Sequence, residues 1–185
     1  EVRAFLRYTS EPDLGQLRHA DRNVESEIEM FRGDLRDVEA VRQAMEGREI
    51  VFHLGALISI PYSYIHPRET IETNVLATLN LLMAARDLGR EIRFVHASSS
   101  EVYGTALSVP MDESHPLQSQ SPYAASKTAA DKLVESFHHA YGLAATTVRP
   151  FNTYGPRQSG RAVVPAIITQ ALHGNTVALG NASPV

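Results

Sequence analysis

Two short apolar runs decide the fold: IVFHLG at residues 50–55 and IRFVHA at residues 92–97. Each has the length and composition of a buried strand. After an irregular stretch, residues 68–88 are predicted to form a long helix, and Gly89 stands where helices commonly end. The apolar stripe of that helix is predicted to consist of Ile71, Val75, Leu79 and Leu82. A strand, a helix and a strand in this order predict a right-handed crossover between parallel strands.

The same alternation continues in both directions along the chain. Strand patterns at 2–8, 28–31 and 143–148 alternate with helical patterns at 35–45, 121–141 and 162–172. Together they predict an α/β fold with a doubly wound parallel sheet of the Rossmann-like type. No repeat or linker composition divides the 185 residues, which are few enough for one domain.

Composition and charge exclude several classes of protein. The net charge of −4 provides no basic footprint for nucleic acid, so no nucleic-acid partner is expected. No apolar run approaches the roughly 20 residues that cross a bilayer, so no membrane role is expected. The chain has no cysteine, which excludes disulfides and zinc–thiolate sites and favours a cytoplasmic location. Its histidines lack metal-ligand spacing with carboxylates, so no metal is expected and packing or surface roles are predicted for them.

Small and polar residues follow the predicted strand ends, where sheets of this type bind ligands. These positions are Gly33-Asp34, Gly55-Ala56, residues 98–101 and Phe151-Asn152. Tyr123 and Lys127 stand four residues apart on a predicted helix, so their side chains share one face. A nearby ammonium favours a phenolate and lowers its pKa, so this pair is predicted to act as a general base near neutral pH. Ser99 is predicted to bind the hydroxyl that Tyr123 deprotonates.

Three ordered motifs resemble those of the extended short-chain dehydrogenases, the NAD-dependent epimerase/dehydratase family of nucleotide-sugar enzymes. They are HASSSEVYG at 96–104, SPYAASK at 121–127 and RPFNTYGP at 149–156. The runs ALISIPYSY at 56–64 and RPFNTYGPRQ at 149–158 most resemble UDP-N-acetylglucosamine 4,6-dehydratases of the legionaminic-acid type and GDP-mannose 4,6-dehydratases. The resemblance implies an enzyme that uses tightly bound, recycled NAD or NADP on a nucleotide-sugar substrate, and a homodimer formed through the helices at 68–88 and 121–141.

The resemblance also assigns roles to individual positions. It implies that Tyr123 is the base at the sugar C4 hydroxyl, that Lys127 tunes this base and holds the nicotinamide ribose, and that Ser99 orients the same hydroxyl. The positions implied to bind the cofactor, besides Tyr123 and Lys127, are Asp34, Leu35, Gly55, Ala56 and Ala97. Those implied to bind substrate, besides Ser99, are Ser59, Ser100 and Asn152. Asn74 matches a helix asparagine of structural or positioning use, and a plain polar position near the helix start is an equal alternative.

Glu101 distinguishes the reactions that this family performs. A 4,6-dehydratase needs a further base for the C5 proton, and the resemblance places it two positions after the catalytic serine, where Glu101 stands. Ser100 replaces the aspartate of glucose-type dehydratases and resembles the GDP-mannose type. The sequence therefore predicts a 4,6-dehydratase that acts on UDP-N-acetylglucosamine. The alternatives are a nucleotide-sugar 4-epimerase and a non-catalytic nucleotide-binding relative, and the intact Ser99, Tyr123 and Lys127 argue against the latter.

The glycine-rich phosphate loop of the family is absent from these residues. If residues 2–8 are the family's second strand, the first βα unit and most of the C-terminal substrate region lie outside this sequence. Residues 1–185 are then a partial NAD(P)-binding Rossmann-like domain, in which 151–185 begin the substrate-binding part. Without its central first strand, the sheet is expected to have two unpaired edges and a gap in the core. Arg7 and Ser10 replace the acid of NAD-specific enzymes, which favours NADP and leaves NAD open.

Overall fold

The computed structural model describes residues 1–9, 14–89, 91–174 and 176–179. The chain divides into two compact units, Glu1–Phe151 and Asn152–Val185. In the described residues, the first unit contains all the strands and the helices between them, and the second contains helix α7 (Val163–His173). Of the described candidate site residues, Asn152 alone belongs to the second unit.

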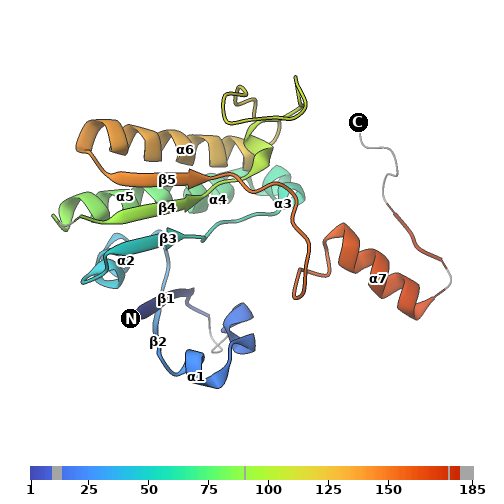
Figure 1. Cartoon of the computed structure of the whole chain (residues 1–185), viewed down its shortest axis with the longest axis horizontal. Coiled ribbons are helices and arrows are strands. Elements are labelled where there is room, and N and C mark those ends of the chain that lie inside the picture. Colours follow the sequence, from blue (N-terminus) through green and yellow to red (C-terminus); the bar gives the residue numbers. More distant parts are fainter. Residues whose placement is uncertain (10–13, 90, 175, 180–185) are drawn as a thin grey trace. The chain divides into compact units, whose positions relative to one another are not determined.

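The strands of the first unit form two separate parallel sheets (Figure 1). Strand β1 (Val2–Arg7) pairs with β2 (Ile28–Gly33), and the short helices η1 (Gly15–His19) and α1 (Arg22–Glu25) lie between them in sequence. The other sheet has the order β3–β4–β5, with bounds Ile50–His53, Arg93–Ala97 and Ala144–Val148. Every adjacent pair of strands is parallel, so the predicted parallel α/β architecture is confirmed.

A cavity of about 550 Å³ lies between the two sheets. Its lining includes consecutive residues of β1 from Val2 to Leu6 and of β3 from Ile50 to His53. Successive residues of a strand point to opposite faces, so a cavity that touches each residue in turn runs along the strand edge. Among the described residues, β1 pairs only with β2, and β3 pairs only with β4. The structure therefore has the two open edges and the core gap expected from the sequence.

Three helices build the core of the first unit against β4. Helices α2 (Val38–Met45) and α5 (Ala77–Asp87) pack on each other, and α5 also packs on α6 (Pro122–Tyr141) (Figure 1). Val41, Leu82 and Phe94 are at most 1% exposed within this cluster. Alternation along β4 buries Phe94 and His96 completely, so a polar ring lies among the core side chains. On β3, successive side chains also point to opposite faces, and Phe52 remains exposed while His53 is buried.

The predicted helix 68–88 is present, but it contains a wider turn. It consists of α4 (Pro67–Ile71), a π-helical turn η2 (Glu72–Leu76) and α5. The predicted apolar stripe is partly wrong, because Ile71 is 39% exposed while Thr70, Asn74 and Thr78 are buried. Burial of the two threonines is tolerated because each has a local partner: the Thr70 hydroxyl donates to the His66 carbonyl and the Thr78 hydroxyl to the Asn74 carbonyl.

The sequence pattern predicts an irregular stretch before this helix, and that prediction is partly wrong. The stretch contains helix α3 (Ile60–Ile65), which Ser59 caps by accepting a hydrogen bond from the Tyr62 amide. The Ser63 hydroxyl, fully buried, accepts a hydrogen bond from the amide of Tyr123 at 3.2 Å. Helix α3 therefore supports the start of α6, where the candidate catalytic pair lies.

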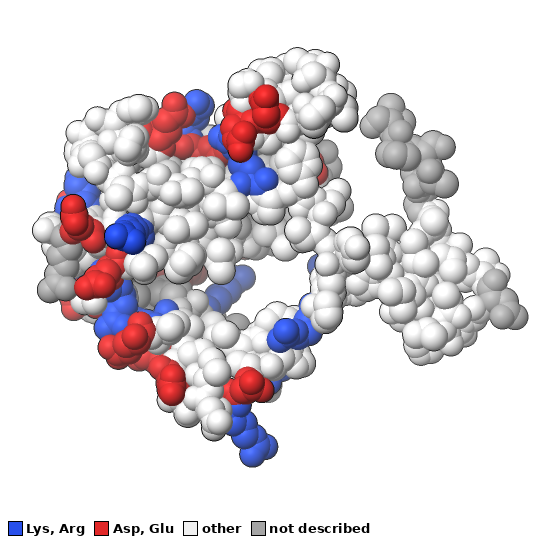
Figure 2. Space-filling model, in the orientation of Figure 1, with Lys and Arg blue, Asp and Glu red and all other residues white. Residues whose placement is uncertain are grey.

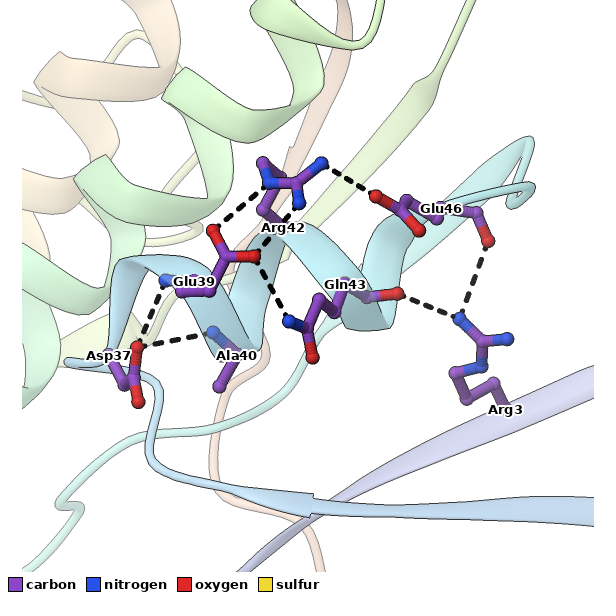
Figure 3. A network of polar contacts seen from close by, with 7 residues as sticks. All are labelled: Arg3, Asp37, Glu39, Ala40, Arg42, Gln43 and Glu46. Atoms are coloured by element: carbon purple, nitrogen blue, oxygen red, sulfur yellow. Dashed lines mark hydrogen bonds and ion pairs between the residues drawn. The ribbon is translucent and has the colours of Figure 1, made fainter.

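Helix α2 is fixed at both ends by side chains (Figure 3). The Asp37 carboxylate accepts hydrogen bonds from the amides of Glu39 and Ala40, which is the usual N-cap arrangement. At the other end, the Arg3 guanidinium of β1 donates to the carbonyls of Gln43, Ala44 and Glu46. A cation at the C-terminus of a helix is favourable. This contact ties β1 to the helix that precedes β3.

Charges are mixed over the surface of the first unit. On the face in Figure 2, acidic and basic side chains are interspersed. Many of them form local pairs, such as Arg42 with Glu39 and Glu46. Within the part of the chain that the structure describes, no helix has the length and apolar character needed to span a bilayer.

Candidate active site

The start of helix α6 positions Tyr123 and Lys127. Ser121 is the N-cap and accepts a hydrogen bond from the Ala124 amide, and Pro122 occupies the first helical position, where its missing amide proton costs nothing. The Tyr123 and Lys127 side chains follow one turn apart, and the two residues are 6% and 3% exposed. The predicted pair is therefore on one helix face and inside the protein.

The turn after β4 brings Ser99 to the same place. Ser99 caps the short helix η3 (Ser100–Val102), where its hydroxyl accepts a hydrogen bond from the Glu101 amide at 3.3 Å. The Ser99 side chain also lowers the pKa of the Tyr123 phenol, so the two side chains lie close together. The Ser100 amide donates to the Pro150 carbonyl at 3.1 Å, which joins this turn to the end of β5. The structure thus assembles Ser99, Glu101, Tyr123 and Lys127 from two segments of the chain.

The phenol of Tyr123 has a raised pKa, which corrects the direction expected from the sequence. Burial raises this pKa most, the Ser99 side chain lowers it, and the Glu101 carboxylate raises it. The Lys127 ammonium donates instead to the Ala97 carbonyl at 2.6 Å. Burial was absent from the sequence argument, and here it outweighs the other influences on the phenol.

Lys127 is a buried cation whose charge is easily lost. Burial lowers its pKa to about 8, and the Asp131 carboxylate acts in the opposite direction. An ammonium has three donors, and one of them is used by the Ala97 carbonyl. Two donors therefore remain for the hydroxyls of a ribose, which fits the implied role of Lys127 toward a nicotinamide cofactor. Ala97 takes part through its carbonyl, which orients the lysine.

The predicted adenine and turn positions lie against each other. A Cβ atom placed on Gly55 would lie 2.5 Å from Leu35 Cδ1, so a larger residue at position 55 would require the Leu35 side chain to move. Asp34 and Ala56 are the neighbouring residues of this contact, and both are half-buried. The structure therefore brings the pair 34–35 to the pair 55–56 across the gap between the sheets.

Arg36 was missed by the sequence argument. Its guanidinium donates to both carboxylate oxygens of Asp34, at 3.0 and 2.6 Å, and this hydrogen bonding is the largest cause that lowers the pKa of Asp34 to about 2. Arg7 also lowers that pKa, so it lies on the same side of the cofactor positions. Its proposed companion Ser10 lies outside the described residues. The sequence signal that could have identified Arg36 is its position two residues after an acid at the end of a strand.

The predicted substrate positions are distributed over several segments. Ser59 is half-buried at the N-cap of α3, and Ser100 is half-buried beside Ser99. Asn152 is exposed and opens the second unit. Ser100 lies in the turn at residues 98–103, which we call the catalytic turn because it holds the candidate catalytic residues Ser99 and Glu101. Ser59 instead caps helix α3, which supports the start of α6.

Asn74 has the structural use that the sequence argument allowed. It is 1% exposed, its Oδ1 accepts from the Leu57 amide at 2.7 Å, and its Nδ2 donates to the Leu57 carbonyl and to the Ser126 hydroxyl. It therefore links the segment after Ala56 to the helix of Lys127. Packing roles are seen for His53, His96 and His115, each at most 7% exposed. The described residues contain no cluster of three potential metal ligands.

Comparison with known proteins finds similarity to sugar-nucleotide 4,6-dehydratases. A sequence model of the family described as "GDP-mannose 4,6 dehydratase" matches residues 1–185. The dTDP-glucose 4,6-dehydratase of Xanthomonas campestris pv. campestris (strain B100) is 36% identical over 154 residues, which are 77% of this chain and 44% of the relative. The dTDP-glucose 4,6-dehydratase of Streptomyces antibioticus is 38% identical over 152 residues, 82% of this chain and 45% of the relative. The chain thus spans about half the length of these relatives.

Solved structures show the same likeness. DesIV, a dTDP-glucose 4,6-dehydratase from Streptomyces venezuelae with NAD and TYD bound, has a TM-score of 0.85 and 33% identity over 96% of this chain and 54% of its own. A UDP-N-acetylglucosamine 4-epimerase from Methanobrevibacter ruminantium M1 has a TM-score of 0.81 and 31% identity over 89% of this chain and 54% of its own.

Proposed function

Because the chain belongs to the GDP-mannose 4,6-dehydratase family, we propose that this protein removes water from a nucleotide-linked hexose to give the 4-keto-6-deoxy sugar. The observation that carries the proposal is the grouping of Ser99 and Glu101 in one turn against the Tyr123 phenol. A buried base for a hydroxyl and an exposed carboxylate beside it match the two deprotonations that dehydration requires.

The first step needs a base at the C4 hydroxyl. Tyr123 takes the hydroxyl proton, and Ser99 orients the same hydroxyl through its own side chain. A bound nicotinamide would accept the C4 hydride and later return a hydride to C6, and the proton that Tyr123 has taken balances the proton that C5 then regains. Lys127 would hold the ribose of that cofactor with its two free donors, and its positive charge favours the phenolate form of Tyr123 once the substrate covers the site.

The second step needs a carboxylate at C5. Oxidation at C4 makes the C5 proton acidic, and Glu101 takes it. The C6 hydroxyl must leave as water, and the proton that Glu101 has gained balances this departure. Ser100 occupies the position of a separate acid, so Glu101 is the acid as well as the base. Its exposure allows it to reach a substrate, and its effect on the Tyr123 pKa indicates that it stands near the phenol.

We also propose the finer assignments that the sequence motifs favour. The substrate is UDP-N-acetylglucosamine, supported by the run at 56–64, and Ser100 in place of aspartate argues against a glucose-type substrate. The cofactor is tightly bound NAD or NADP, and Arg7 beside Asp34 supports NADP. A homodimer and a cytoplasmic location complete the proposal, the latter because the chain lacks cysteine.

The test is to incubate the full-length protein separately with UDP-N-acetylglucosamine, dTDP-glucose and GDP-mannose and to analyse products by mass spectrometry and NMR. Loss of one water from the first substrate supports the proposed reaction and substrate, and loss from another corrects the substrate only. A C4 epimer of unchanged mass supports the 4-epimerase alternative, and no product with any substrate supports a binding protein.

Glu101→Gln tests the assigned base. It is expected to lower elimination by about 100-fold or more while C4 oxidation continues, seen as reduced nicotinamide without a dehydrated product. Glu113→Gln removes an exposed acid from the following loop and is the matched control, expected to act as the wild type. Full dehydration by Glu101→Gln would refute the role of Glu101.

A further inference from the structure

A buried polar cluster lies directly behind the candidate active site. It consists of His96 on β4, Asp131 on α6, and Arg149 at the end of β5, with Ser98 and Tyr103 from the turn after β4. The Arg149 Nε donates to Asp131 Oδ2 at 2.9 Å, and its NH1 donates to the Tyr103 hydroxyl at 3.2 Å. The cluster therefore joins two strands, helix α6 and the catalytic turn.

Asp131 is the centre of this cluster. It is 3% exposed, and its other oxygen, Oδ1, lies 3.3 Å from His96 Nε2, a contact whose geometry falls short of a hydrogen bond. Burial raises the pKa of the Asp131 carboxyl, while His96, Ser98 and Arg149 lower it by more, so the group is ionised at neutral pH. A buried carboxylate without such partners would be strongly destabilising.

Asp131 follows Lys127 by one helical turn, so the two charged groups share the buried face of α6. They form no direct ion pair, because the lysine donates to the Ala97 carbonyl and the aspartate is held by Arg149. The other described titratable groups near Lys127 and Asp131 come from several elements. They are His53 on β3, His96 on β4, Arg149 after β5, Tyr123 on α6 and Glu101 in the turn after β4. Both histidines have lowered pKa values because of burial, so they are neutral. Asp131 is thus the anion that acts on Lys127.

We propose that Asp131, clamped by Arg149, is a positioning residue that keeps the Lys127 ammonium charged and directed to the carboxyl end of β4. Without the clamp, the carboxylate would be free to pair directly with the lysine and draw it away from Ala97. Arg149 also stacks over the Tyr103 ring, with 5.3 Å between its guanidinium carbon and the ring centroid. Because Tyr103 closes the turn that holds Ser99 and Glu101, the same clamp fixes the distance between that turn and the lysine.

The test is a pair of substitutions that change the charge around Lys127 in opposite directions. In the full-length protein, Asp131→Asn removes the anion, so the alkaline limb of the activity profile is expected to move from about pH 8 toward neutrality. Arg149→Gln removes a competing cation, so the same limb is expected to move to higher pH. Glu135→Gln removes an exposed acid from the same helix and is the control, with no shift expected.

The inference rests on the proposed function for the activity readout, so a second readout is needed. The pH dependence of acetic anhydride labelling of Lys127, quantified by mass spectrometry, reports the lysine pKa in each variant without catalysis. Opposite shifts in labelling support the positioning role even if no dehydration is found, in which case only the proposed function fails. Unchanged labelling in both folded variants, or shifts in the same direction, would overturn it. If Asp131→Asn does not fold, the sign of the Arg149→Gln shift decides.

Discussion

Removal of the Asn74 side chain is expected to destabilise the first unit more than removal of the Asn80 side chain. Asn74→Ala deletes three hydrogen bonds, of 2.7, 3.0 and 2.8 Å, at a residue that is 1% exposed. The Ser126 hydroxyl keeps its bond to the Tyr123 carbonyl, so the amide and carbonyl of Leu57 are the groups left without a partner. Each unpaired buried group costs about 1–3 kcal/mol.

Partial access of water to Leu57 reduces this cost. Leu57 is half-buried, so we expect a loss of about 2–4 kcal/mol rather than the full sum. Asn80→Ala is the matched control, because Asn80 donates one hydrogen bond, to the Leu35 carbonyl at 3.0 Å, from a half-buried position. Its expected loss is about 1 kcal/mol.

The assay is urea unfolding of the full-length protein, followed by circular dichroism, with the midpoint and slope fitted for both variants. Asn74→Ala is also expected to weaken cofactor binding, because Leu57 follows the turn at Gly55-Ala56 and Ser126 precedes Lys127. A loss for Asn74→Ala no larger than that for Asn80→Ala would refute the reasoning that these buried bonds hold the segments together.

Two further predictions follow from backbone and titration. Gly104→Ala is expected to destabilise the protein by about 2 kcal/mol or more, because Gly104 has φ +66° and a Cβ would collide with the Gln118 carbonyl. Gly142→Ala is the control, because Gly142 has φ +69° but open space around it, and it is expected to lose about 1 kcal/mol. Thermal unfolding of both variants measures the difference. His53→Gln is expected to lessen the loss of stability as pH falls from 6.5 toward about 3. The reason is that burial lowers the pKa of the folded His53 ring to about 3, whereas the unfolded ring takes up its proton near pH 6.5. Urea midpoints measured as a function of pH test this, and equal acid sensitivity of wild type and variant would contradict it.

The sequence predicted the strands and the catalytic helix well, because both depend on local signals. Apolar runs of strand length mark β3 and β4, and Ser121 with Pro122 marks the start of α6. The π-turn and the polar buried face of the long helix were not predictable in this way. Thr70 and Asn74 are buried because particular carbonyl groups lie within reach, and hydrophobic periodicity carries no information about such partners.

The candidate site shows a similar division. Ser99, Tyr123 and Lys127 were found from spacing, and the structure assembles them. The electrostatics of these residues could not be predicted from spacing, because the direction of the Tyr123 pKa shift depends on burial and on where the Lys127 side chain points. Asp131 follows Lys127 by four residues, so its place on the same face was predictable, but its clamp by Arg149 depends on a contact between residues 18 positions apart in sequence.

The residues proposed for proton chemistry lie in one half of the first unit, whereas the positions proposed for the cofactor lie on both sides of the gap between the sheets. Ser99, Tyr123 and Lys127 all belong to the β3–β4–β5 half, whose strands are paired and whose helices α5 and α6 are packed. The positions for adenine and turn, Leu35 and Gly55, lie on opposite sides of the gap and meet through one side chain. A gap there leaves the catalytic side chains in place but weakens the platform on which a dinucleotide must lie. Residues 1–185 alone are therefore expected to bind NAD or NADP poorly in calorimetric titration, while Lys127 labelling keeps the pH dependence of the full-length protein. Tight cofactor binding by this chain alone would show that the half containing β3 provides the platform by itself.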